Sequence, residues 1–196
     1  MGAPAVGSRA GILLGFVPLI LYGILAGPSP ESKVIALGAA TLVTVVAGIG
    51  DLKKGRILTW ASLLLFGGLL VAAAGFARTG ILTWSGVLIN AVLAGVTLGS
   101  ILAGVPFTLQ YAREMVDPAH HGTPVFLSVN RLMTGVWGGV FTVNALLNYL
   151  ALVLPTTAGR VSSLLTYLFL AAGIVFTLWY PGHIRKKYAR ASPGRR

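Results

Sequence analysis

Long apolar runs separated by short polar stretches make up almost all of the 196-residue chain. About 20 apolar residues cross the hydrocarbon core of a membrane as a helix, because lipid cannot satisfy an open backbone. Six runs of suitable length lie at residues 10–26, 34–50, 57–77, 81–105, 132–154 and 161–180. The pattern predicts an all-α, polytopic membrane domain over residues 1–196, with the first run retained rather than cleaved as a signal peptide.

Two polar segments interrupt or follow these runs: a central loop at residues 106–131 and a basic tail at residues 183–196. In the loop, Thr108 to Val116 has helical character, and Asp117 before Pro118 ends it because proline disfavours a helical residue before it. A short interfacial helix then leads through Phe126 and Arg131 into the fifth span. Pro181 and Gly182 are expected to close the sixth span.

The basic residues predict the orientation of these spans. With both termini cytoplasmic, the inner segments carry twelve of the fifteen Lys and Arg residues. The outer loops then carry only Lys33, Arg78 and Arg160. Lys and Arg concentrate on the cytoplasmic side of membrane proteins, so an even number of spans and an N-in, C-in topology support each other.

The composition excludes several classes of protein. Hydrophobic residues make up 56% of the chain and charged residues only 10%, whereas soluble domains carry about 25% charged residues. The net charge of +11 therefore indicates topology and anionic lipid headgroups rather than nucleic acid as a partner. The absence of Cys excludes disulfides, thiolate metal sites and a cysteine nucleophile.

Small residues spaced four apart occur inside two of the predicted spans. Gly95 with Gly99, Ser100 with Gly104, and Gly135 with Gly139 are such pairs. Small residues let helix backbones approach closely in lipid. The pairs predict close packing within one chain, or alternatively the face of a homo-oligomer.

Three asparagines also lie inside spans, Asn90 in the fourth and Asn144 and Asn148 in the fifth. A buried amide needs a hydrogen-bond partner in lipid, so these side chains are expected to hold neighbouring helices together. The alternative is a polar path for a solute. No ionisable residue lies near the middle of a predicted span, which argues against an ion pump or a proton-driven carrier.

The sequence offers no catalytic motif, metal site or cofactor site. No G-x-S-x-G elbow, H-E-x-x-H motif or Gly-rich phosphate loop is present. His120 and His121 are adjacent and so cannot easily bind one ion, and His183 lies in the basic tail. We therefore expect no catalytic residues, no metal and no cofactor, and a protein that is not an enzyme.

The polar segments contain the residues expected to bind protein partners. They are Tyr111, Arg113, Glu114, Arg131, Arg185, Lys186 and Lys187. The basic tail is expected to rest on anionic lipid, where each Lys or Arg contributes about 1 kcal/mol. Its alternative role is to bind an acidic partner.

The layout resembles the intracellular septation protein A family of bacterial inner-membrane proteins. The resemblance rests on Phe16-Val17-Pro18-Leu19, Phe66-Gly67-Gly68-Leu69, a fourth span that begins at Trp84, a fifth span that bears asparagines and ends at Leu154-Pro155, and the segment from Pro106 to Glu114 (PFTLQYARE). It covers nearly the full chain. It implies a small polytopic protein of the bacterial inner membrane that maintains the cell envelope and takes part in division through contacts with other membrane proteins.

Together these features predict a non-enzymatic membrane scaffold, or an accessory subunit of a larger membrane complex. The alternative is a small uncoupled transporter or channel whose path is lined by Asn90, Asn144 and Asn148. The arrangement of the asparagines distinguishes the two. A transporter requires them to face one hydrated cavity, and a scaffold requires them to lie between packed helices.

Overall fold

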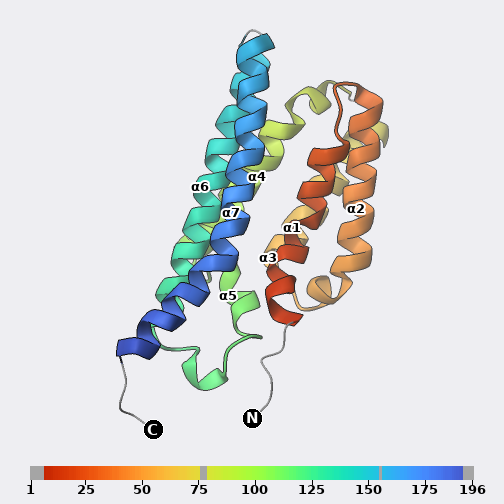
Figure 1. The fold of residues 1–196 in the computed structure, drawn as a ribbon. Coiled ribbons are helices and arrows are strands. Elements are labelled where there is room, and N and C mark those ends of the chain that lie inside the picture. Colours follow the sequence, from red (N-terminus) through yellow and green to blue (C-terminus); the bar gives the residue numbers. More distant parts are fainter. Residues whose placement is uncertain (1–6, 76–78, 155, 192–196) are drawn as a thin grey trace.

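A computed structural model describes residues 7–75, 79–154 and 156–191, and within these ranges every regular element is a helix (Figure 1). The elements are α1 (Gly7–Leu25), α2 (Pro30–Lys53), α3 (Ile57–Leu70), the π-helical turn η1 (Val71–Gly75), the 3₁₀ segment η2 (Thr79–Trp84), α4 (Ser85–Leu102), α5 (Phe107–Ala112), the 3₁₀ turn η3 (Pro118–His120), α6 (Pro124–Val153) and α7 (Thr156–Ala191). This confirms the predicted all-α class. Within the described ranges, five helical stretches are long and apolar enough to cross a membrane, namely α2, α3 with η1, the η2–α4 stretch, α6 and α7.

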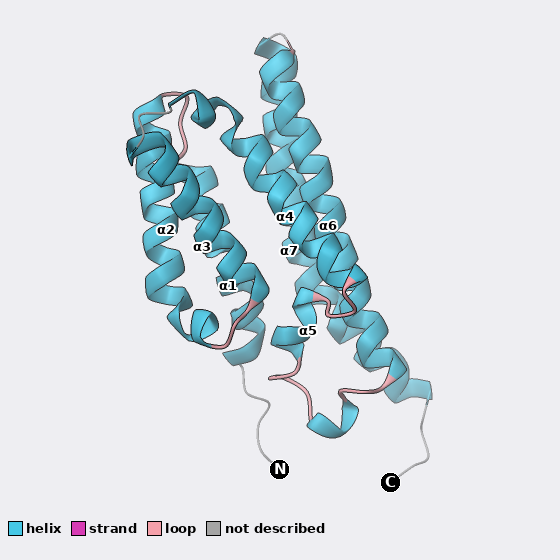
Figure 2. Ribbon diagram, turned by 180° about the vertical axis from the view of Figure 1, so that it is seen from behind, coloured by secondary structure: helices cyan, strands magenta, loops and turns pink. Residues whose placement is uncertain are grey.

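The long helices form two groups that pack against each other. Figure 2 shows α1, α2 and α3 on one side, and α4, α6 and α7 on the other. The short α5 lies between the two groups at one end of the bundle, beside the turn that joins α2 to α3. We call this the α5 end.

Local sequence signals explain where the helices begin and turn. The Ser29 hydroxyl accepts a hydrogen bond from the Ser32 amide at 3.2 Å, and Thr123 caps α6 in the same way. A proline follows each cap, at the position where its missing N–H costs nothing. Gly55 and Gly104 have positive φ angles of 67° and 75°, so the chain can turn sharply after α2 and after α4.

Helices α4 and α6 pack closely in an antiparallel register. A Cβ atom built on Gly138 would lie 2.5 Å from Leu98 Cδ2, and one on Gly86 would overlap the Asn148 amide. A residue of α4 and a residue of α6 therefore lie at the same level of the bundle when their numbers add up to about 234 to 236. By this register, Asn90 lies level with Asn144. Glycines at these contacts let the two backbones approach.

Aromatic side chains join the two groups of helices. Phe16 of α1 stacks on Trp137 of α6 with ring centroids 3.9 Å apart, and both rings are almost fully buried. Phe107 of α5 meets the edge of Phe16, and the Trp137 indole N–H donates to Thr177 of α7 at 2.9 Å. One cluster thus fixes α1, α5, α6 and α7 relative to one another.

Two predicted boundaries are wrong. Residues 106–131 do not form one loop: α5, which overlaps the stretch from Thr108 to Val116 predicted to be helical, is buried, and residues 124–131 are the first turns of α6 rather than a separate interfacial helix. The cap at Thr123 and Pro124 starts α6 earlier than apolar content alone indicates. Helix α7 also continues through Pro181 to Ala191, because one proline removes only a single helical hydrogen bond.

Candidate functional site

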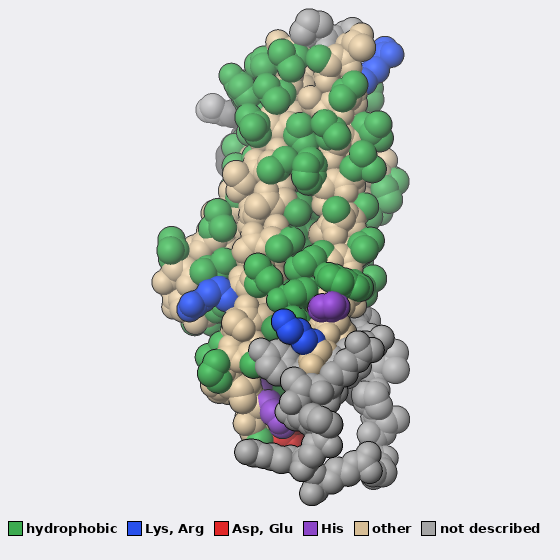
Figure 3. Space-filling model, turned by 60° about the vertical axis from the view of Figure 1, so that its left-hand side comes forward, with side chains coloured by type: hydrophobic (Ala, Val, Ile, Leu, Met, Phe, Trp, Pro, Cys, Tyr) green, Lys and Arg blue, Asp and Glu red, His purple; other side chains and the backbone are tan. Residues whose placement is uncertain are grey.

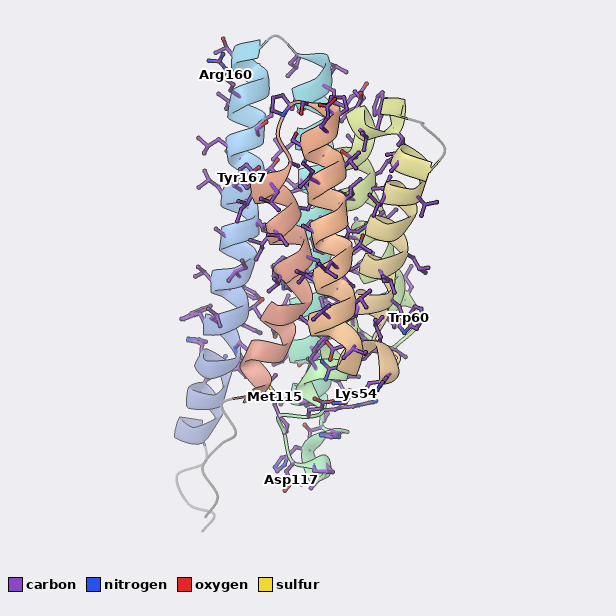
Figure 4. The ribbon with its side chains drawn as sticks, turned by 90° about the vertical axis from the view of Figure 1, so that its right-hand side faces the viewer. Lys54, Trp60, Met115, Asp117, Arg160 and Tyr167 are labelled. Carbon is purple, nitrogen blue, oxygen red and sulfur yellow. The ribbon has the colours of Figure 1, made fainter. Side chains whose placement is uncertain are left out.

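Ionisable side chains from three segments converge on Arg56 at the α5 end. Arg56 is only 5% exposed, and its guanidinium group binds Asp51 at 2.9 Å and Glu114 at 2.7 Å. Its Cζ atom lies 4.1 Å from the centre of the Tyr111 ring, which is cation–π distance. Lys54 binds the second oxygen of Glu114 at 2.8 Å. We call Asp51, Lys54, Arg56, Tyr111 and Glu114 the Arg56 cluster (Figure 4 labels Lys54 at this end).

The turn between α2 and α3 brings this cluster together. The turn at Gly55 places Arg56 immediately before α3, and the Arg56 amide donates to the Asp51 carbonyl at 3.0 Å. The first amide of α3, on Ile57, has no partner within its own helix, and it donates to the Gln110 side chain of α5 at 3.0 Å. Helix α5 is therefore tied directly to the start of α3.

Hydrogen bonds hold α5 from its other side as well. The Thr108 hydroxyl lies 2.9 Å from both the Asn130 carbonyl and the Thr134 hydroxyl of α6. The Phe107 amide donates to the Ser100 hydroxyl of α4 at 3.1 Å. Buried polar groups of this kind require partners, and those of α5 find them on three different helices.

Neighbouring opposite charges lower the pKa of Glu114 and raise the pKa of Arg56. Hydrogen bonds from Lys54 and Arg56 lower the pKa of the half-exposed Glu114 carboxyl. Burial alone would lower the pKa of Arg56, but its bond to Glu114 and the charges of Asp51 and Glu114 outweigh that effect and raise it. The cluster contains two acids and two bases, so its formal charges balance.

The lowered pKa of Glu114 predicts a loss of stability in acid. A carboxyl whose pKa is lower in the folded protein stabilises it fully above its ordinary value of 4.5, and this contribution is lost as the pH falls through the lowered value. We expect the thermal midpoint in detergent to fall more steeply below pH 4.5 in the natural protein than in Glu114→Gln. Identical pH profiles for the two proteins would show that the ion pairs do not contribute.

A small, mainly apolar cavity adjoins the cluster between α1, α2 and α3. Its volume is about 20 Å³, enough for a single water molecule. Its lining residues are Gly15, Pro18, Val43, Thr44, Ala47, Gly48, Asp51, Thr59 and Ser62. The Thr59 hydroxyl lies 3.4 Å from the Tyr111 hydroxyl, so the polar surface of the cluster continues into the three-helix group.

The residues predicted to bind partners do not all lie on the surface. Tyr111 is 2% exposed and packs under Arg56, so its side chain is not available on the surface to bind a partner. Arg113, Arg131 and Lys187 are exposed, and Glu114 is half exposed. The side chains of Arg185 and Lys186 lie outside the described residues.

The three asparagines lie in the packing of α4, α6 and α7. Asn90 donates to the carbonyl of Gly86 in its own helix at 2.9 Å. Asn148 donates to the Asn144 carbonyl and reaches Thr166 of α7 at 3.5 Å. The Asn144 side-chain oxygen is buried and has no hydrogen-bond partner among the described residues. The structure thus brings all three near one another but bonds none of them directly to another asparagine side chain.

The small-residue pairs that the spacing predicts are not the positions at which the helices make their closest contacts. Gly95, Gly99 and Gly139 have open space where a Cβ would stand, so they do not mediate contacts within the chain. Ser100 binds the Phe107 amide, and Gly104 forms the turn after α4. Different glycines provide the close helix contacts: Gly86, Gly138 and Gly173.

The histidines make local contacts. His121 bonds to the Val116 carbonyl at 2.8 Å and stacks on Phe126, while His183 stacks on Trp179. His120 is exposed. In the part of the chain that the structure describes, no three His, Cys, Asp or Glu side chains are grouped so that they could hold a metal ion.

The sequence pattern does not predict the Arg56 cluster. Arg56 is one of the twelve basic residues of the inner segments, and Asp51 directly follows the apolar run at residues 34–50. The signal in the sequence that could have pointed to the cluster is the small number of acidic residues. The chain has four, and two of them bind Arg56. Acids so rare in a basic chain are expected to have specific partners.

Comparison with family models, with curated protein sequences and with solved structures finds no match to this chain. The resemblance to the septation protein A family therefore stays a prediction.

Proposed function

We propose that the chain is a non-enzymatic scaffold, or an accessory subunit of a larger complex, that spans a bacterial inner membrane six times and acts through protein partners. The main supporting observation is that ion pairs and hydrogen bonds from α3, α4 and α6 hold α5 in place. A surface already held in one conformation loses little entropy when a partner binds. The α5 end is therefore suited to binding, and the resemblance to septation proteins suggests partners in the cell envelope.

The charge distribution supports cytoplasmic termini. Among the described residues, Lys53, Lys54, Arg56, Arg113, Arg131 and Lys187 belong to the α5 end. Arg160 lies at the opposite end of the bundle (Figure 4), and Lys33 bonds to the Leu82 carbonyl there. With α1 as a sixth span, the positive-inside rule places the α5 end, the start of α1 and the end of α7 in the cytoplasm.

The partner surface that we propose centres on exposed Arg113 and half-exposed Glu114, directly after α5. Arg131 and Lys187 add positive charge at the same end, so an acidic segment of another membrane protein is the expected partner. Arg113 has no ion pair among the described residues and can be changed without disturbing the Arg56 cluster.

Gentle extraction of the tagged full chain from its native membrane, followed by identification of stoichiometric proteins, tests this proposal. We expect a membrane protein to co-purify with the natural chain and to be lost at least tenfold on Arg113→Glu. Arg160→Glu reverses the same charge at the opposite end and should retain the partner. Equal loss with both variants, or a chain that purifies alone at every detergent concentration, contradicts the scaffold function.

One observation favours the second candidate function, a small uncoupled transporter or channel. The buried Asn144 oxygen lacks a partner and lies level with Asn90, as a water-filled path would require. Among the described residues, no asparagine lines the cavity beside Asp51 or the groove at the start of α6. Glycerol or urea flux into liposomes that is abolished by Asn144→Leu would support the transporter instead.

A further inference from the structure

An open groove lies along the first three turns of α6. Its volume is about 510 Å³, and the described residues that line it are Pro124, Leu127, Ser128, Arg131, Leu132 and Gly135. Their spacing of three and four places them on one face of the helix. The face is apolar except for the Arg131 guanidinium and the Ser128 hydroxyl, and that hydroxyl already donates to the Val125 carbonyl.

Arg131 is the only charged group in this groove, and it has no acidic partner among the described residues. Asp51 and Glu114 bind Arg56, and Glu31 lies at the opposite end, in the first turn of α2. Asp117 caps the η3 turn through the Ala119 amide. The exposed guanidinium is therefore free to bind an anion from outside the chain, in the two-point geometry that phosphate favours.

A row of glycines on α6 and α4 continues from the groove toward the middle of the bundle and forms a strip without side chains. Gly135 lines the groove, and Gly139 follows one turn later on the same face of α6. The antiparallel register puts Gly99 and Gly95 of α4 at the levels of Gly135 and Gly139. A Cβ built on Gly95, Gly99 or Gly139 would meet no atom within 4 Å, so these turns leave room beside the helices.

We propose that this groove binds an anionic phospholipid, with the phosphate on Arg131 and one acyl chain along Leu132, Gly135 and Gly139. Arg131 directly precedes the apolar part of α6, which places it at the depth of the headgroups. Figure 3 shows hydrophobic side chains over the face toward α6 and α7, with Lys and Arg side chains in its lower half and at its upper tip.

A second copy of the chain fits this groove less well. Helices α4, α6 and α7 contain no Asp or Glu, so a partner copy that packed through these helices would bury Arg131 without a counter-charge. An unpaired buried charge is strongly unfavourable. A phospholipid supplies both the anion and the chain that fills the strip.

Native mass spectrometry of the purified full chain, equilibrated with equal amounts of phosphatidylglycerol and phosphatidylcholine, tests the proposal. We expect retained phosphatidylglycerol to exceed phosphatidylcholine in the natural protein and to fall about fivefold in Arg131→Gln, as expected for one arginine contact. Gly139→Leu fills the strip without changing the charge and should also reduce retention. Arg113→Gln removes an exposed arginine at the same end but outside the groove, and should retain the lipid.

Circular dichroism and the thermal midpoint of each variant establish that it is folded. Equal losses in Arg131→Gln and Arg113→Gln would mean that charge alone attracts the lipid, and would overturn the site. Dimers that disappear in Gly139→Leu, with lipid retention unchanged, would assign the groove to a second copy of the chain and overturn it as well.

Discussion

Replacing Arg56 by methionine should lower the stability of the protein by about 3 kcal/mol, because removing one partner of a buried ion pair leaves Asp51 without a counter-charge, while Glu114 keeps only Lys54. The Arg56 side chain is 6% exposed, while Asp51 is 22% exposed and Glu114 is 46% exposed. We use the low end of the usual range since water partly solvates both acids. The thermal midpoint in detergent should fall by roughly 6–12 °C.

Lys54→Met is the matched control. Lys54 binds the same Glu114 carboxylate, but its side chain is 57% exposed, and exposed ion pairs contribute at most about 1 kcal/mol. Adding Asp51→Asn to Arg56→Met should restore part of the loss, because an uncharged amide needs no counter-ion. Equal midpoints for Arg56→Met and Lys54→Met would show that burial of the guanidinium does not matter.

Replacing Gly138 by valine should separate α4 from α6 and cost about 1–3 kcal/mol, as overpacking does. The first added carbon would lie 2.5 Å from Leu98 Cδ2 and 2.9 Å from Leu98 Cγ, and 3.3 Å from the Thr97 hydroxyl. Because the Cγ atom of Leu98 is too close as well as its Cδ2 atom, rotating the end of the Leu98 side chain does not remove the overlap. A lower thermal midpoint and faster proteolysis of the folded protein in detergent would measure the effect.

Gly139→Val is the control for this substitution, because it changes the neighbouring residue of the same helix. Nothing lies within 4 Å of a Cβ at Gly139, so valine there should be tolerated. The comparison cancels the cost of losing a glycine from α6. Comparable destabilisation by both variants would contradict the close α4–α6 contact at Gly138.

The apolar pattern predicted most of the fold correctly, because burial in lipid imposes a simple rule on each span. Helices α2, α3, α4, α6 and α7 each contain or largely overlap a predicted run. The rule does not apply where polar groups find partners within the protein. Thr108, Gln110 and Tyr111 placed the helical α5 segment in a polar loop rather than in the core, yet tertiary contacts satisfy their polar groups.

Contacts between distant residues explain why the candidate site was not predicted. Arg56 is five residues from Asp51 but 58 from Glu114, and no local period joins the two acids. The glycines show the same limit. Spacing identified Gly95 and Gly99, whereas the close contact of α4 with α6 forms at Gly138, which depends on the register of two helices.

Labelling of single cysteines with a membrane-impermeant maleimide tests both the proposed orientation and the buried position of α5. The chain has no cysteine of its own, so Arg160→Cys, Arg113→Cys and Thr108→Cys each report one position. In intact cells we expect labelling at position 160 alone. After permeabilisation position 113 should react, while position 108, fully buried in α5, should react only in denaturant. Labelling of position 113 in intact cells, or equal reactivity at positions 108 and 113 in the folded protein, would contradict this structure and its placement in the membrane.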